Sequence, residues 1–149
     1  MNIIKKPILA PLSNGNYQLT KQYKIKLNNG DLIQIDKGYQ TNGADIPRLF
    51  WRLYPPYAPE YMPAVLIHDY LCDKAAETAQ NKKELQEMFL YADNAFREIL
   101  EKLNISKIKV KIFYNAVRLW HKVRYCKNGF IFICLYYFIT EKNKFRQPK

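Results

Sequence analysis

Three polar side chains fall within apolar helical patterns, and their chemical types are suited to catalysis or metal binding. His68 and Asp69 are neighbours inside the apolar run 64–72. Asp93 lies at the border of the apolar stripe of the next helical pattern. Buried charge is costly unless it is paired or bound to a metal. We therefore expect His68, Asp69 and Asp93 to converge in the folded protein.

One imidazole with two carboxylates allows three interpretations. As ligands, His68, Asp69 and Asp93 suit Zn²⁺, Mn²⁺ or Fe²⁺, with a bound water as the nucleophile of a small hydrolase. Without a metal, an aspartate orients His68 as a general base. In a purely structural interpretation, His68 and Asp69 bond backbone groups and hold a loop against the helices. The residue types alone leave all three open.

His121 is a possible further member of this centre, whereas Cys72, like the other two cysteines, is expected to be a small buried hydrophobic residue. Cys72 follows His68 by four residues, so both lie on one face of a helix. His121, the only other histidine, lies at the edge of the apolar arc of a later helix and is either a further ligand or a packing residue. Such spacings are also typical of helix cores, and neither one by itself indicates a catalytic pair.

The strands expected ahead of these helices come from residues 17–37. Apolar and polar residues alternate from Tyr17 to Leu27 and again from Leu32 to Ile35. Asn28-Asn29-Gly30 between them is typical of a turn, and this pattern predicts a β-hairpin over 17–37. After the hairpin, residues 39–48 form a loop in which Asp45 is placed to cap a short helix.

Three helices are predicted to follow. Residues 63–72 are apolar on almost every side and predict a buried helix. Asn81 and Glu84 have the spacing of a capping box at the start of a helix that ends near Leu103. Ser106 opens a last helix to about Tyr125. The expected inward residues of this last helix are Ile108, Ile112, Phe113, Ala116, Leu119, Trp120 and Val123.

These elements predict an α+β fold, with an N-terminal β-hairpin or small antiparallel sheet packed on three to four helices. The 149 residues are expected to form a single domain, 1–149, with a core over about 15–125. Residues 126–149 hold a basic tail and the apolar segment Phe130–Ile139, which is expected to be a buried strand or terminal packing element, with a membrane-surface or self-association segment as the alternative. That segment is too short for a transmembrane helix, and the N-terminus lacks the pattern of a signal peptide.

Composition and motifs exclude several functional classes. Three cysteines without a CxxC pair indicate neither a zinc finger nor a disulfide framework. There is no nucleotide-binding glycine loop and no Gly-x-Ser-x-Gly motif of a serine hydrolase. Hydrophobic residues make up 48% of the chain, which is typical of a folded protein and excludes a wholly disordered one.

Positive charge is concentrated in the C-terminal third. The chain has 24 Lys and Arg against 13 Asp and Glu, and residues 101–149 hold 12 of the basic residues with only Glu101 and Glu141 as acids. Such asymmetry favours a polyanionic partner, either nucleic acid, an acidic protein surface or an anionic membrane, or else a solvated lysine-rich surface. The candidate contacts share one face of the last helix and are expected to point away from its apolar arc. They are Lys107, Lys111, Arg118 and Lys122.

Four blocks of sequence carry a family resemblance. They are 38–48 (GYQTNGADIPR), 64–71 (AVLIHDYL), 92–96 (ADNAF) and 114–118 (YNAVR). In this order they resemble the phage and prophage domain-of-unknown-function family 1353 (DUF1353), over about residues 15–125. The resemblance implies a phage or prophage origin but no established reaction.

The chain departs from the family pattern at three positions. Asn42 stands where the family usually has Asp, Asp45 where it has Ser, and Cys72 where it has Tyr. Asp45 would supply the missing acid if the loop folds over His68, so we expect this loop to share a pocket with the buried centre. Asp45 is therefore a candidate catalytic residue, and Asn42 and Arg48 are candidate binding residues.

The resemblance and the residues together lead to three functional hypotheses. The first is a phage accessory or virion-associated protein of tail or morphogenesis type, located in the host cytoplasm or the virion, with phage structural proteins among its partners. The second is a small metal-dependent hydrolase that uses His68, Asp69 and Asp93. The third is a non-specific nucleic-acid binder acting through the basic face of the last helix.

Overall fold

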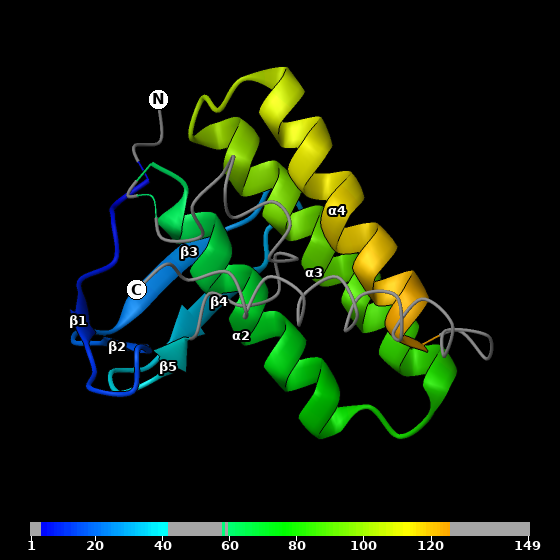
Figure 1. Ribbon diagram of the computed structural model, residues 1–149, viewed down its shortest axis with the longest axis horizontal. Coiled ribbons are helices and arrows are strands. Elements are labelled where there is room, and N and C mark those ends of the chain that lie inside the picture. Colours follow the sequence, from blue (N-terminus) through cyan, green and yellow to red (C-terminus); the bar gives the residue numbers. More distant parts are fainter. Residues whose placement is uncertain (1–3, 42–57, 59, 126–149) are drawn as a thin grey trace, which may run out of the picture.

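Two small antiparallel sheets precede three packed helices in a computed structural model of the protein, which describes residues 4–41, 58 and 60–125 (Figure 1). This arrangement confirms the α+β fold class. The predictions made for Asn42, Asp45, Arg48 and the segment 130–139 lie outside the described residues.

The first sheet has three strands in the order β1 (Leu9–Pro11), β2 (Tyr17–Leu19) and β5 (Gln40–Thr41). Both neighbours run antiparallel to β2, and Tyr17 lies opposite Thr41. Strand β5 is also in contact with helix α2 (Met62–Thr78). This sheet therefore brings Thr41 close to the helix that carries His68 and Asp69.

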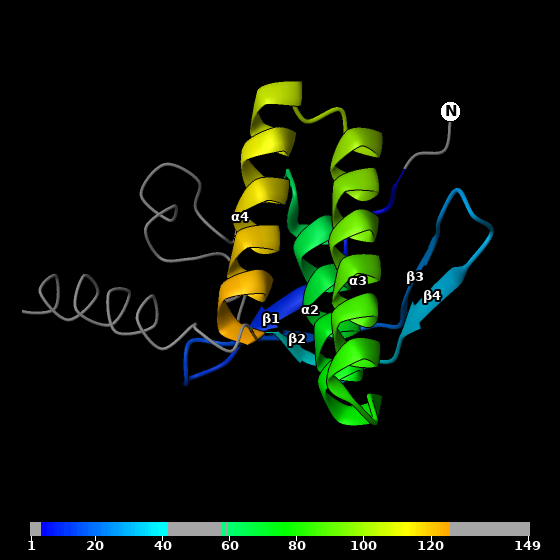
Figure 2. The ribbon, with the colours of Figure 1, turned by 90° about the vertical axis from the view of Figure 1, so that its right-hand side faces the viewer.

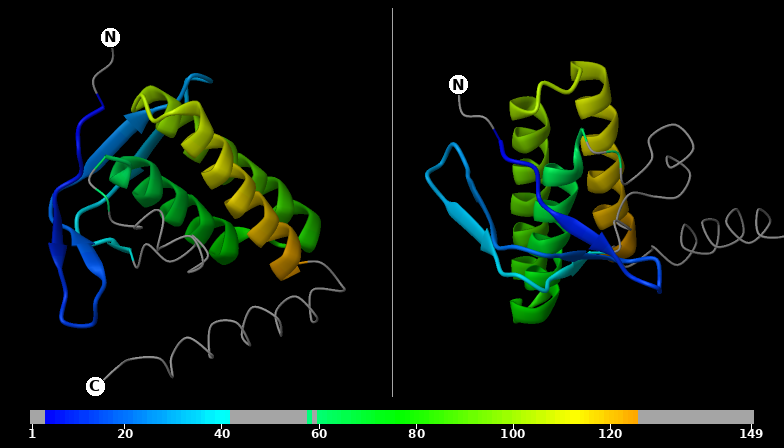
Figure 3. Two further views of the ribbon diagram at one scale, coloured as in Figure 1. Left: turned by 45° about the horizontal axis from the view of Figure 1, so that its top comes forward. Right: turned by 90° about the vertical axis from the view of Figure 1, so that its left-hand side faces the viewer.

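The second sheet is the hairpin of β3 (Tyr23–Lys26) and β4 (Leu32–Ile35), in which Ile25 lies opposite Ile33. The turn forms as expected, because Gly30 adopts a φ of 94°, a conformation that glycine tolerates at little cost. The hairpin packs against α3 (Lys82–Lys102), on the side of that helix away from α4 (Lys107–Tyr125) (Figures 2 and 3).

The hairpin is shorter than the predicted range 17–37. The predicted first strand divides at Thr20, whose backbone amide and hydroxyl both donate to the carbonyl of Ile8. The amide of Leu19 donates to Tyr39, so this part of the chain pairs with the first sheet. Alternation along the chain does not reveal this change of pairing partner. The buried residues keep the same two-residue spacing from the first sheet into the second.

The helices begin close to the predicted residues. The side chain of Asn81 accepts from the amide of Glu84 at 2.9 Å, and the Glu84 carboxylate accepts from the amide of Gln80 at 2.8 Å. Ser106 Oγ accepts from the amide of Lys109 at the start of α4. Helix α2 is longer than predicted and continues to Thr78. Helix α3 packs against both α2 and α4, as Figure 2 shows.

The buried face of α4 differs from the predicted one. Ile108 and Leu119, expected to point inward, are 74% and 63% exposed. The inward stripe repeats at intervals of three and four residues and ends in a histidine. The buried residues of α4 are Val110, Phe113, Ala116, Val117 and His121. The predicted inward positions of Phe113 and Ala116 are therefore confirmed. The helix is rotated in this way because His121 reaches a buried aspartate of α3, and apolar periodicity alone does not detect such a polar partner.

The core joins both sheets to the helices. Its fully buried members come from β2, β4, all three helices and Tyr61 just before α2, and the largest also include Leu19, Ile35, Leu66, Phe96 and Phe113. Within the described ranges, no helix combines the length and the apolar character that crossing a bilayer needs.

Candidate functional site

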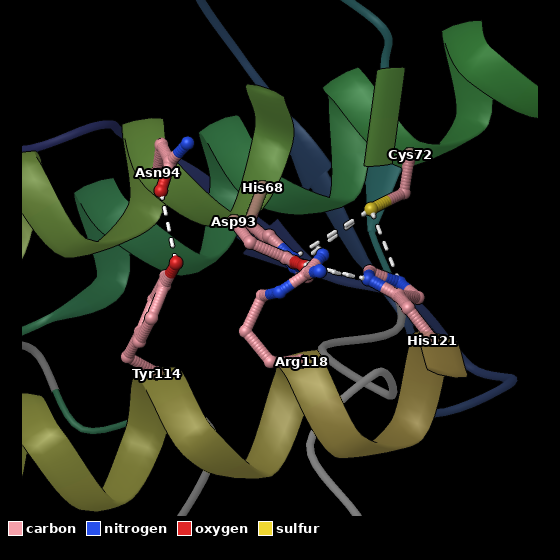
Figure 4. A network of polar contacts seen from close by, with 7 residues as sticks. All are labelled: His68, Cys72, Asp93, Asn94, Tyr114, Arg118 and His121. Atoms are coloured by element: carbon pink, nitrogen blue, oxygen red, sulfur yellow. Dashed lines mark hydrogen bonds and ion pairs between the residues drawn. The ribbon is translucent and has the colours of Figure 1, made fainter. Parts of the chain in front are cut away.

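The site is built around the carboxylate of Asp93, which is completely buried on α3. Its Oδ1 lies 2.8 Å from His68 Nε2 on α2 and 3.0 Å from His121 Nδ1 on α4. Its Oδ2 accepts from Arg118 Nη1 at 3.0 Å. Figure 4 shows the three helices supplying this cluster. Because an ionised carboxylate only accepts hydrogen bonds, these contacts place a proton on His68 Nε2 and on His121 Nδ1.

The contacts of the cluster shift the pKa values of Asp93 and of both histidines. Burial acts to raise the pKa of Asp93, but hydrogen bonds from His121 and His68 outweigh it and hold that pKa well below its usual value. Burial acts to lower the pKa of His68, but the electrostatic interaction with Cys72 and the bond to Asp93 raise it well above its usual value. For His121, the bond to Asp93 likewise outweighs burial and raises the pKa.

A thiol completes the cluster. Cys72 Sγ lies 3.7 Å from His68 Nε2, 4.0 Å from His68 Nδ1 and 3.7 Å from His121 Nε2. One ligand atom can be chosen from each of these three residues so that all three atoms lie within 4.8 Å of one another. All three side chains are buried, with 3%, 5% and 7% of their surface exposed for His68, Cys72 and His121. This buried group has the composition and spacing needed to hold a metal ion.

Aromatic rings hold the two imidazoles in place. The His121 ring stacks on Phe89, with ring centroids 4.4 Å apart, and the His68 ring lies 5.1 Å from Phe96. The two imidazoles are themselves stacked, with centroids 5.6 Å apart. Apolar walls of this kind fix ring orientation and exclude water, which strengthens the electrostatic interactions inside.

Two chemistries fit these contacts. One is metal binding by His68, Cys72 and His121. The other is activation of the Cys72 thiol by His121, with Asp93 bonded to the other ring nitrogen of His121 and fixing the orientation of that imidazole. A nucleophilic thiol must itself reach its substrate, and Cys72 is only 5% exposed and does not line the groove between α3 and α4, whereas the proposed metal ligand His121 does line it. Burial therefore favours metal binding over thiol catalysis.

Arg118 links the buried cluster to the surface. It is 22% exposed and lines a groove of about 350 Å³ between α3 and α4. His121 and Lys122 line the same groove. The prediction that Arg118 points away from the apolar arc is wrong, because the buried charge of Asp93 draws its guanidinium inward.

Asp69 has a different partner from the other predicted residues. It is buried, and its Oδ2 accepts from the hydroxyl of Thr41 at the end of β5. One turn further along α2, Asp73 accepts from the hydroxyl of Tyr39 at 2.6 Å. The structure thus brings His68 and Asp93 together, whereas Asp69 joins α2 to the first sheet.

Cys72 and His121 are the members of the centre that the sequence pattern indicates most weakly. The i, i+4 spacing of Cys72 from His68 was a signal, but it is also common in helix cores. The signal for His121 was its position four residues after Val117 on the stripe that is buried. Spacing within one helix does not indicate which residue of another helix it contacts. The sequence pattern alone therefore does not predict the cluster.

Comparisons with known proteins place the chain in a family. Residues 17–117 match the family described as "Protein of unknown function (DUF1353)", and the chain belongs to it. An uncharacterized protein, y4jT, of Sinorhizobium fredii (strain NBRC 101917 / NGR234) is 30% identical over 66 residues. That stretch covers 44% of this chain and 20% of the relative, so the match spans about a fifth of that protein's length. No solved structure matches.

The family match confirms the resemblance found in the sequence, over slightly fewer residues than the expected 15–125. Neither the family description nor the relative's name mentions a phage. The phage origin, the association with a virion or with phage structural proteins, and the location in the host cytoplasm therefore stay predictions.

Proposed function

We propose that this protein binds Zn²⁺ through His68, Cys72 and His121 and uses the ion for hydrolysis. The observation that carries the proposal is the position of Asp93, which bonds one nitrogen of each histidine. The other nitrogens, His68 Nδ1 and His121 Nε2, remain for a metal and lie 4.0 and 3.7 Å from the thiol. In zinc sites, the ring nitrogen of a ligating histidine that does not bind the metal typically donates a hydrogen bond to a carboxylate.

The distance from the Cys72 thiol to His121 supports this assignment. In tetrahedral geometry, a nitrogen and a thiolate sulfur bound to one Zn²⁺ lie about 3.6 Å apart. The contact between Cys72 Sγ and His121 Nε2 is 3.7 Å. A thiolate with two imidazoles favours Zn²⁺ over the harder Mn²⁺. The proposed ligands therefore include His68, as the sequence predicted. Cys72 and His121 take the place of the two predicted aspartate ligands.

Three protein ligands leave one position for water, which is the arrangement of catalytic zinc sites. Zinc lowers the pKa of bound water to about 7, so hydroxide becomes available as a nucleophile near neutral pH. In this scheme Asp93 keeps both imidazoles oriented, and Arg118 compensates part of the carboxylate charge. The substrate classes to test are phosphate esters and peptides.

The test is metal content, measured by mass spectrometry after the protein is loaded with Zn²⁺ and desalted. The wild type should keep about one ion per chain, and Cys72→Ser and His121→Gln should lose it. A Co²⁺-loaded sample should show a thiolate-to-cobalt charge-transfer band that Cys72→Ser removes.

Asp69→Asn is the matched control, because Asp69 is also a buried polar residue of α2 but bonds Thr41. It should retain the metal. Loss of metal in Asp69→Asn with retention in Cys72→Ser would reject the proposed ligands in favour of the sequence-derived set. Absence of Zn²⁺ binding at micromolar concentration would reject the metal function altogether.

A second candidate function, non-specific binding of nucleic acid, is favoured by a second hollow. Lys107 and Lys111 line a cavity of about 610 Å³ where α3 ends and α4 begins. Arg97 and Tyr114 line it too, with the guanidinium 4.8 Å from the centre of the tyrosine ring. Cations beside an aromatic ring suit a phosphate backbone and its bases. The charge of these residues supports a polyanionic partner without indicating a preferred sequence.

A further inference from the structure

We infer that the groove between α3 and α4 binds a phosphate monoester that carries an apolar or aromatic group. The phosphate would contact Arg118 and Lys122, and the apolar group would cover Leu90 and Phe89. This inference deepens the proposed function, on which it rests for the role of the metal, because it names the class of ligand that would approach the centre at His121.

The charges of the groove favour an anion. Its charged lining residues are Lys83, Glu87, Arg118 and Lys122. Lys83 and Glu87 form an exposed ion pair at 3.9 Å, and Arg118 is paired with Asp93, so Lys122 carries the excess positive charge of the groove. In the part of the chain that the structure describes, no carboxylate lies within ion-pair distance of Lys122.

Arg118 can bind a second anion without leaving the first. Its Nη1 donates to Asp93, and a guanidinium has five N–H donors in all. Because the side chain is 22% exposed, part of it also faces the groove. Guanidinium groups bind phosphate through paired hydrogen bonds, so Arg118 is suited to hold Asp93 on one side and a phosphate on the other.

Part of the opposite wall of the groove is apolar, beside the polar residues Lys83, Gln86 and Glu87. Leu90 is 40% exposed and lines the groove beside Phe89. An inorganic phosphate would leave this wall uncovered, whereas an ester with a ring or alkyl group would bury it and gain hydrophobic free energy. The volume of about 350 Å³ lies in the range of small-molecule sites.

His121 is the connection between this groove and the buried centre. It lines the groove, and its two nitrogens face Asp93 and Cys72. A phosphate held by Arg118, three residues earlier on α4, would therefore lie next to a proposed metal ligand. The second hollow lacks any of the centre's residues, so its lysines provide a control of similar charge.

The experiment is calorimetric titration with phenyl phosphate, carried out on both Zn²⁺-loaded and chelator-treated protein, with the metal content of each sample measured. Lys122→Gln should weaken binding about tenfold, the loss expected for one charge-assisted hydrogen bond. Lys111→Gln, in the second hollow, should change it less than about twofold. Leu90→Ser should weaken phenyl phosphate but not inorganic phosphate, and phenol should bind more weakly than phenyl phosphate.

These outcomes separate the inference from the metal proposal. Binding to the metal-free protein that is sensitive to Lys122→Gln supports the groove, even where Zn²⁺ is not retained. Retention of Zn²⁺ without binding of phenyl phosphate at millimolar concentration overturns the groove alone. Equal losses in Lys122→Gln and Lys111→Gln would indicate general attraction by positive charge and would also overturn it. Circular dichroism of each variant confirms that these exposed substitutions leave the helices intact.

Discussion

His121 Nδ1 lies 3.0 Å from the carboxylate of Asp93, although 28 residues separate the two in the chain, and this contact joins α4 to α3 inside the protein. It explains why α4 presents a histidine, and not Leu119, to the interior. The same carboxylate also bonds His68 on α2. One buried charge therefore ties three helices together, and its removal has consequences for each.

Asp93→Asn should destabilise the metal-free protein by about 3 kcal/mol, because it leaves Arg118 and two protonated imidazoles without their counter-charge. Urea unfolding in the presence of a chelator measures this change. Asn94→Ser is the control, since the neighbouring Asn94 is exposed and bonds Tyr114 at 3.0 Å; its cost should stay under about 1 kcal/mol. Equal effects of the two substitutions would contradict a central role for Asp93.

Stability of the metal-free protein should depend on pH in a defined way. The pKa of Asp93 is held below the usual 3.8, so its stabilising contribution is present above pH 3.8 and is lost as pH falls towards its folded-state pKa. The pKa values of His68 and His121 are raised above the usual 6.5, so their contribution is present below pH 6.5 and is lost as pH rises through the raised values.

The cluster should therefore contribute most between about pH 4 and about pH 6.5. Urea unfolding of chelator-treated protein at pH values across this range and on either side tests the prediction. His121→Gln should reduce the loss of stability on the alkaline side. An unfolding free energy that is the same in wild type and variant at every pH would show that His121 does not gain from its contact with Asp93.

The bond between Thr41 and Asp69 should have a measurable structural effect. Asp69→Ala removes the acceptor of the Thr41 hydroxyl in a buried place and should cost about 1–3 kcal/mol. A double-mutant cycle with Thr41→Val measures the interaction directly, since both variants lose the same bond. Strictly additive effects would show that the two side chains act independently.

Binding of duplex DNA should depend on salt with a slope of roughly −3 in log K against log[salt], because three lysines of α4 are available for phosphate contacts. These are Lys107, Lys111 and Lys122, whose side chains are exposed, whereas Arg118 is only 22% exposed and faces the groove. The double variant Lys107→Gln, Lys111→Gln should flatten the slope by about 2 units, with no difference between DNA sequences of equal length. Fluorescence anisotropy with labelled DNA provides the measurement. No binding at low salt would exclude this function.

The local features of the fold could be predicted from the sequence because their causes are local. Asn81 caps its helix through a backbone amide three residues away, and the turn at Gly30 depends on the conformation of one glycine. The burial of His68 followed from the apolar residues on every side of its own helix. In each case the partner or the constraint lies within one or two turns of the chain.

Tertiary packing decided which polar groups meet. Periodicity placed His68 and Asp69 both in the interior, but only the position of β5 gives Asp69 its partner in Thr41. Likewise, the rotation of α4 about its axis determines that His121 reaches Asp93 and Cys72. Apolar residues specify a face only to within about one residue position, because hydrophobic burial is non-directional. Hydrogen bonds have strict distances and angles, so the buried Asp93 selects the one rotation of α4 that satisfies it.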